Sequence, residues 1–177
     1  MTDPAPPPVV VGLHLAPGRR LPMHDVDAVV LEAGAGIVGD RYHGSRHRHV
    51  TLQAADDLAV AGERLAAPVP AGRTRRNVTV DRGPVVAVPG ARARLGEALL
   101  EVVRVAAPCR IMDDEVAPGA ARALHGLAGT VFRVVEGGRV ALGDAYVEIP
   151  VDPDEARERA AASRAAATAR GRTVPLP

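Results

Sequence analysis

The sequence has little of several residue types that often carry structure or chemistry: one cysteine, no tryptophan, and aromatic residues at only 2% of 177. A single cysteine excludes an intrachain disulfide and a zinc site built from several cysteines. There is no lysine, so all 22 Lys+Arg positions are arginine. With so few aromatics, the core must be built from aliphatic side chains, and a hydrophobic content of 47% is enough for a packed domain.

An excess of charge of one sign and long apolar runs are also missing. The formal net charge is +1 at pH 7, so the chain as a whole does not attract nucleic acid or anionic membranes. No apolar run is long enough to span a membrane, and the first residues lack a signal-peptide pattern. We therefore expect a cytoplasmic protein with no nucleic-acid and no membrane partner.

Composition divides the chain into three parts. Residues 1–8 form a proline-rich tail that we expect to be disordered, residues 9–150 form one domain, and residues 151–177 form an extension rich in alanine and arginine. In the extension, Asp154 is placed to cap a helix that reaches about residue 167. The weak apolar stripe of that helix predicts a solvated segment.

Short β-type runs separated by glycine and proline dominate the middle part. We expect strands at residues 9–15, 28–32, 49–53, 77–80, 85–88, 99–105, 130–135 and 139–142. Helices are expected at residues 54–65 and 118–124. Many short strands with few helices predict a mainly β fold, a closed or nearly closed β-barrel with a few peripheral α-helices.

Two hairpins are expected within this region. The run VVEGGRVALGD places Gly137 and Gly138 at a turn, where glycine tolerates positive φ. The run VPGARARLGEALLEV is typical of a strand, a tight turn and a second strand.

One glycine-rich stretch matches a nucleotide-binding motif by its letters alone. Gly34, Gly36 and Gly39 satisfy G-x-G-x-x-G, but the dinucleotide motif needs a helix that begins within the glycines. The following residues 40–44 have no helical period, and the next expected strand comes too soon for a crossover helix. We expect an irregular turn and no dinucleotide site.

Arginine and histidine alternate closely just after these glycines. His43, His47 and His49 allow a metal site, because alternating residues can share one face of a strand. The arginines between them would repel a divalent cation, whereas a guanidinium presents a planar fork of donors to a phosphate. Anion binding is therefore the favoured interpretation, with Arg41 and His43 as its best candidates.

A second polar patch, GRTRRNVTV at residues 72–80, changes from basic residues to a β-pattern at Asn77. The side-chain amide of Asn77 can both donate and accept hydrogen bonds at the mouth of that strand. The patch is either a basic loop leading into a strand or part of a binding site.

Cys109 follows the end of the strand-like run ALLEVVRV and lies between Pro108 and Arg110. A lone cysteine is often an inert core residue, but the end of a strand is also a common place for a site. Metal ligation and persulfide chemistry need the thiolate. An arginine about 4 Å away stabilises a negative charge by roughly 4 kcal/mol at an effective dielectric of 20, so Arg110, Arg41 or Arg75 could activate the sulfur.

Three segments together resemble one family. The segments GIVGDRYHG…HVTLQ, GRTRRNVTVDRG…VPGARARLGEALLEVVRVAAPCR and GLAGTVFRVVEGGRVALGDAYV are similar to a MOSC domain, the module found at the C-terminus of molybdenum cofactor sulfurases. The resemblance covers about residues 9–149. It implies a fold centred on a β-barrel and a functional cysteine, which falls on Cys109.

The resemblance also implies a cofactor site. The related amidoxime-reducing components hold molybdenum through this thiolate and bind the pterin phosphate with basic and amide groups. Their Arg-x-Asn turn falls on Arg75 and Asn77, and Arg41, His43 and Arg110 would add further cofactor-binding groups. The sequence shows no pyridoxal-phosphate desulfurase segment, so we expect a separate protein to donate sulfur or electrons.

The function expected from the sequence is thus the handling of molybdenum cofactor or sulfur through Cys109. One form is a molybdenum-dependent reductase of N-hydroxylated compounds, and the other is a persulfide carrier or sulfur transferase. Two alternatives remain open: a non-catalytic module that binds a phosphorylated ligand, and the histidine metal site at residues 43, 47 and 49.

Overall fold

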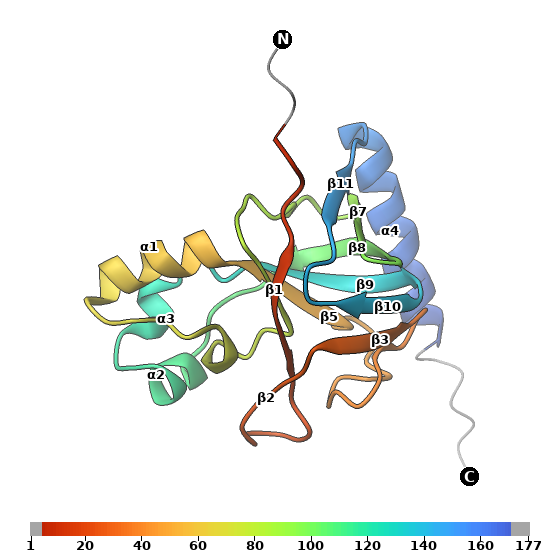
Figure 1. Ribbon diagram of the computed structural model, residues 1–177. Helices are drawn as coiled ribbons and strands as arrows, with labels where there is room; N and C mark the ends of the chain where they lie inside the picture. The colour runs from red at the N-terminus through yellow and green to blue at the C-terminus, as the bar shows by residue number, and fades with distance from the viewer. Residues whose placement is uncertain (1–4, 171–177) are drawn as a thin grey trace.

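The computed structural model describes residues 5–170 of the chain (Figure 1). Its strands are β1 (Val10–Leu15), β2 (His24–Asp25), β3 (Ala28–Glu32), β4 (Gly36–Ile37), β5 (Val50–Ala54), β6 (Val78–Val80), β7 (Arg92–Leu95), β8 (Ala98–Val105), β9 (Thr130–Glu136), β10 (Gly138–Ala141) and β11 (Tyr146–Ile149). Its helices are α1 (Ala55–Leu65), α2 (Ile111–Glu115), α3 (Ala120–Ala123) and α4 (Pro153–Arg170), with one 3₁₀ turn, η1 (Ala71–Arg73).

The strands form two sheets, so the expected mainly β fold is confirmed. An eight-stranded mixed sheet has the order β11-β7-β8-β9-β5-β6-β1-β2, and a three-stranded sheet has the order β10-β3-β4. The parallel pair is β5 with β6, and the other pairs are antiparallel. All residues of β5 are buried, because this strand lies in the middle of the large sheet. The core of this sheet is mostly aliphatic, and its buried cluster includes Leu52, Leu100 and Phe132.

The large sheet bends until its two sides approach each other. Val9 and Ala145 form an isolated antiparallel bridge, Val10 N donates to Asp144 O at 2.9 Å, and Gly143 N donates to Val10 O at 2.8 Å. Within residues 5–170, β1 and β11 meet through this bridge and not through a ladder. The closed barrel therefore stays a prediction.

The strand expected at residues 85–88 is not formed. Pro84 and Pro89 flank this run and lack the N–H groups that a ladder needs. Val86 N donates instead to the hydroxyl of Tyr146 at 3.0 Å. An apolar run between two prolines thus packs against the sheet as an extended loop.

The hairpin expected at Gly137 and Gly138 is also wrong. β10 pairs with β3, with Gly138 opposite Leu31, whereas β9 pairs with β8 and β5. Neither glycine has a positive φ. A Cβ on Gly137 would lie 2.5 Å from the Leu31 carbonyl oxygen, so glycine serves close approach of two chains where the chain passes between sheets. The other hairpin, β7 with β8, is confirmed, with Leu95 opposite Ala98.

The helices occupy two sides of the molecule. Figure 1 shows α1, α2 and α3 together on one side and α4 on the other. Helix α1 confirms the expected helix at residues 54–65, whereas α3 is shorter than expected and α2 was not expected. A second apolar cluster, which includes Leu58, Met112 and Leu124, joins the first three helices.

Helix α4 begins two residues earlier than the sequence suggested. Asp152, not Asp154, is the cap, because its Oδ1 accepts hydrogen bonds from Asp154 N at 2.8 Å and Glu155 N at 3.3 Å. Pro153 then occupies the first helical position, where its missing N–H costs nothing.

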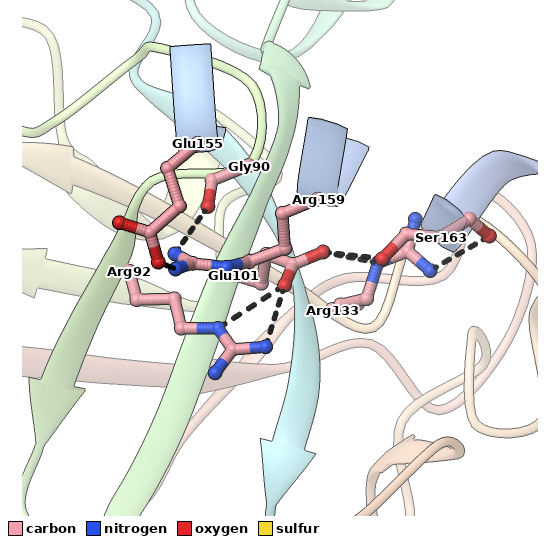
Figure 2. Close-up of polar contacts among 7 residues, drawn as sticks. All are labelled: Gly90, Arg92, Glu101, Arg133, Glu155, Arg159 and Ser163. Atoms are coloured by element: carbon pink, nitrogen blue, oxygen red, sulfur yellow. Dashed lines mark hydrogen bonds and ion pairs between the residues drawn. The ribbon is translucent and has the colours of Figure 1, made fainter. Parts of the chain in front are cut away.

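The extension over residues 153–169 is mostly exposed, as expected, but one side of its helix packs on the sheet, which was not expected. Ala156, Ala160 and Ala167 are buried on the sheet side of α4. Figure 2 shows Ser163 of α4 meeting Glu101 of β8, with Ser163 Oγ donating to Glu101 Oε1 at 2.6 Å. The other carboxylate oxygen of Glu101 accepts two hydrogen bonds from Arg92 at 3.1 Å (Figure 2). The helix is thereby fixed to the sheet through a buried, fully bonded carboxylate.

Replacing Gly90 with alanine should loosen α4. Gly90 has φ +86°, and an added Cβ would lie 1.9 Å from the Ala156 carbonyl oxygen. We expect a loss of about 2–4 kcal/mol in the free energy of unfolding, from backbone strain and overpacking together. Gly143→Ala is the matched control, because Gly143 also has φ +86° but no atom within 4 Å of an added Cβ. Equal losses in urea denaturation of the two variants would contradict the contact with α4.

Among the described residues, the helices are too short or too polar to cross a membrane.

Candidate functional site

Arginines from three separate segments line one small cavity, which we call the arginine pocket. Its volume is about 230 Å³, and it is lined by Arg19, Arg20, Arg41, Tyr42, Arg48, Arg75, Arg76, Ala107, Cys109 and Ile111. None of these lining residues is acidic. Such a concentration of guanidinium groups repels cations and favours an anion.

Cys109 lies at the surface of this pocket, in the loop between β8 and α2. The residue is exposed, so the interpretation as an inert core residue is wrong. Its carbonyl oxygen accepts a hydrogen bond from Met112 N at 2.9 Å, where α2 begins. The thiol is thus held at the end of a strand and is accessible from solvent.

Arg76 fixes the loop that carries the cysteine. Its Nε donates to Ala128 O at 2.8 Å, and its Nη2 donates to Ala107 O at 3.2 Å. The pKa of Arg76 is lowered to about 10, mainly by burial and also by the charge of Arg48, whereas the charge of Cys109 opposes this shift. The thiol and this guanidinium therefore share one electrostatic environment.

Arg75 is the most unusual residue of the pocket. It has φ +61°, and its side chain is only 3% exposed. Nη1 donates to Leu21 O and lies 3.7 Å from a carboxylate oxygen of Glu115, but Nε and Nη2 have no hydrogen-bond partner among the described residues. Burial lowers the pKa of Arg75, and repulsion from Arg41 lowers it further. A buried cation on a strained backbone, with two donors that lack partners, destabilises the ligand-free protein.

Two of the pocket arginines pack against the ring of Tyr42. The guanidinium carbons of Arg41 and Arg48 lie 4.4 Å and 4.2 Å from the centre of its ring. Each arginine is held there by cation–π attraction, and Arg41 Nη2 also donates to the Tyr42 hydroxyl at 3.1 Å. The Nε atoms of both arginines are buried without a partner among the described residues. The stack therefore brings two like charges close together and leaves donors available.

Asp40 and Asn77 hold the loop that carries Tyr42 in place. Asp40 is buried, its Oδ1 accepts from Tyr42 N at 2.9 Å, and its Oδ2 accepts from Asn77 Nδ2 at 3.0 Å. Asn77 Oδ1 in turn accepts from the Thr51 hydroxyl at 2.8 Å, and Asn77 Nδ2 also donates to His14 O at 3.3 Å. The amide of Asn77 is thus committed to joining β1, β5 and the Tyr42 loop.

The structure brings together three of the residues that the sequence singled out: Arg41, Arg75 and Cys109 line the same pocket. His43 is exposed and pairs with Glu32 at 2.8 Å, outside the lining. Asn77 is buried and Arg110 is exposed just before α2, and both are outside the lining.

Sequence reasoning missed Arg19, Arg20 and Tyr42 and gave no role to Arg48 or Arg76. Arg19 and Arg20 lie in a loop after β1, and no spacing links them to the other segments. The sequence did contain a signal for Arg76, because it is the last basic residue before Asn77 and the strand that follows.

The alternative histidine metal site is not formed. His49 is buried, its Nε2 lies 2.7 Å from Ser45 O, and its Nδ1 accepts from Val134 N at 3.0 Å. No group of three metal-ligating side chains occurs among the described residues. The glycines before this loop form β4 and turns, and no helix begins there, as expected.

Comparison with known proteins identifies relatives of this fold. The family model of the MOSC domain matches residues 39–147. The YuaD protein from Bacillus subtilis is similar in structure, with a TM-score of 0.70 and 19% identity over 81% of this chain and 97% of that chain. YiiM from Geobacillus stearothermophilus has a TM-score of 0.68 and 19% identity over 96% of this chain and 92% of that chain.

YiiM from Escherichia coli is also similar, with a TM-score of 0.59 and 18% identity over 96% of this chain and 80% of that chain. At such identities these structures show a shared fold alone. None of the curated proteins matches the chain significantly. The family model covers more than half of the sequence and includes Arg41, Arg75 and Cys109. The chain therefore belongs to the MOSC domain family.

Proposed function

We propose that the protein binds the molybdenum cofactor, or a similar phosphorylated pterin, at the arginine pocket, with Cys109 as the thiolate ligand of the metal. One observation carries the proposal: buried Arg75, with two donors that have no partner among the described residues, lines the same pocket as the exposed Cys109. Membership of the MOSC family supports the choice of ligand.

The residues present fit such a group. Thiolate is a soft metal ligand, and arginine matches the geometry of a phosphate. The cavity of about 230 Å³ is smaller than the roughly 300–1,000 Å³ of most small-molecule sites. It therefore suits the phosphate-bearing end of a ligand whose remainder extends beyond the cavity.

Each part of the pocket has a distinct task in this proposal. Arg75 binds the anion through Nε and Nη2, Arg41 and Arg48 neutralise its remaining charge, and Arg76 holds the loop of Cys109 in place. Bound molybdenum would supply two-electron chemistry for the reduction of a substrate such as an N-hydroxylated compound. A separate donor protein would supply the electrons.

The exposure of Cys109 favours a second candidate function, a persulfide carrier. A sulfur donor and an acceptor must both reach the sulfur, and a surface thiolate beside arginines permits this. In this form the arginine pocket would bind an anionic part of the acceptor.

Anion binding can be tested separately from the metal. Phosphate at about 100 times its dissociation constant should stabilise the protein by about 2.7 kcal/mol, which raises its melting temperature by roughly 5–10 °C. Arg75→Met should lose this response, because it removes both unused donors. It should keep the stability of the ligand-free protein, because it also removes a buried charge.

The control is Arg46→Met, which removes the same charge from an exposed position outside the pocket. Differential scanning fluorimetry in phosphate, against chloride at equal ionic strength, measures the effect. A full phosphate response in Arg75→Met, or none in the wild type, would refute the anion site.

A further inference from the structure

A second, larger cavity lies beside β1 and α1 and shares no lining residue with the arginine pocket. Its volume is about 770 Å³. We call it the β1–α1 groove, and its lining includes Val11, Leu58, Ala59, Pro68, Val69 and His14. The wall is mostly apolar with few polar groups, which is the usual make-up of a small-molecule site.

His14 of β1 lines the groove and has one ring nitrogen without a hydrogen-bond partner among the described residues. The residue is 8% exposed, and its Nδ1 lies 2.8 Å from Asp25 Oδ1. In the neutral imidazole, Nδ1 then carries the hydrogen that Asp25 accepts, so Nε2 is an acceptor. Nε2 is buried and has no hydrogen-bond partner among the described residues.

Glycine keeps the space beside this ring open. A Cβ on Gly12 would lie 3.1 Å from His14 Nε2, and a Cβ on Gly72 would lie 3.3 Å from His14 Nδ1. Gly12 lines the groove together with His14. The unused nitrogen therefore lies at the wall of the groove beside Gly12, where a larger residue at position 12 would crowd it.

We propose that the β1–α1 groove binds a small, mostly apolar molecule through a single hydroxyl or N–H group that donates to His14 Nε2. The apolar body of the ligand packs against Leu58 and Val69, and its donor satisfies an acceptor that is otherwise left without a partner. Asp25 acts as a positioning residue, because it fixes the tautomer that accepts.

The probe is 2-naphthol, which combines a fluorescent apolar ring system with one hydroxyl donor. Saturable binding to the full chain is expected. The methyl ether, 2-methoxynaphthalene, lacks the donor and should bind about tenfold more weakly, since one hydrogen bond to a buried acceptor has roughly that effect. His14→Leu should weaken 2-naphthol binding to the level of the ether and leave the ether unchanged.

Two further variants test the groove without changing His14, so the test does not depend on whether His14→Leu folds. Ala59 is exposed on α1 and lines the groove, so Ala59→Trp should block binding of both probes. Val60→Trp is the matched control, because Val60 is 40% exposed on the same helix and does not line the groove. It should bind both probes as the wild type does.

Three outcomes would overturn the proposal: no saturable binding of 2-naphthol, equal affinity for 2-naphthol and its ether in the wild type, or binding that Ala59→Trp leaves intact. The first would mean that water alone satisfies Nε2. Sedimentation that shows a dimer broken by Ala59→Trp, without probe binding, would assign the groove to a second copy of the chain and equally overturn it.

Discussion

Replacing Cys109 with serine should remove molybdenum from the purified protein and leave the melting temperature of the cofactor-free protein unchanged. A hydroxyl is a poor ligand for a soft metal and cannot hold a persulfide, so either form of the proposed function is lost completely. Cys109 is exposed, and substitutions at exposed positions usually change the free energy of unfolding by no more than about 0.5 kcal/mol.

The control for this variant is Val105→Ser at the end of β8. Val105 is 51% exposed and lies outside the arginine pocket, so its replacement should leave the metal content unchanged. Elemental analysis and thermal unfolding of both variants give the comparison. Molybdenum retained by Cys109→Ser, or a clear loss of stability in that variant, would contradict the account of an exposed ligand.

Replacing Asn77 with alanine should destabilise the whole protein. Its side chain accepts from Thr51 N and Oγ1, and it donates to Asp40 Oδ2 and His14 O. Alanine leaves these buried groups without partners, at about 1–3 kcal/mol for each group that cannot rearrange. We expect a total loss of about 3–5 kcal/mol in urea denaturation.

The same variant should weaken phosphate binding, because Asp40 joins Asn77 to the loop of Tyr42. His47→Ala is the control, since His47 is exposed in that loop and outside the pocket. A loss below about 1 kcal/mol in Asn77→Ala would show that the network contributes little, and Asn77 would then be free to act as a ligand-binding group.

Sequence pattern identified much of the sheet because apolar runs between glycine and proline mark buried strands. It failed where glycine has more than one use. Gly137 and Gly138 allow a turn, but they equally allow the close approach to Leu31 that the structure uses. The choice depends on β3, which lies about one hundred residues earlier, so local reasoning could not make it.

Helix α4 was underestimated for a different reason. Ala156, Ala160, Ser163 and Ala167 recur at helical spacing and face the sheet. Small residues give a weak apolar signal, and alanine is so frequent in this segment that the stripe does not stand out. Its docking depends on Glu101, a charged residue whose burial the sequence of β8 did not reveal.

The candidate site was partly predictable because Arg41, Arg75 and Cys109 each follow or precede a strand. Arg75 and Asn77 are two residues apart, yet Arg75 lines the pocket and Asn77 is buried outside the lining. Arg75 has φ +61°, so the chain does not run through it as a regular strand. A left-handed arginine has no sequence signature, so the positioning role of Asn77 emerged only from the structure.

The most direct test of the central claim is the molybdenum and pterin content of the wild-type protein, produced in a host that makes the cofactor. The account predicts about one molybdenum and one pterin per chain, with the pterin lost from Arg75→Met and the metal lost from Cys109→Ser. A wild-type protein that binds phosphate but carries neither molybdenum nor pterin would contradict it.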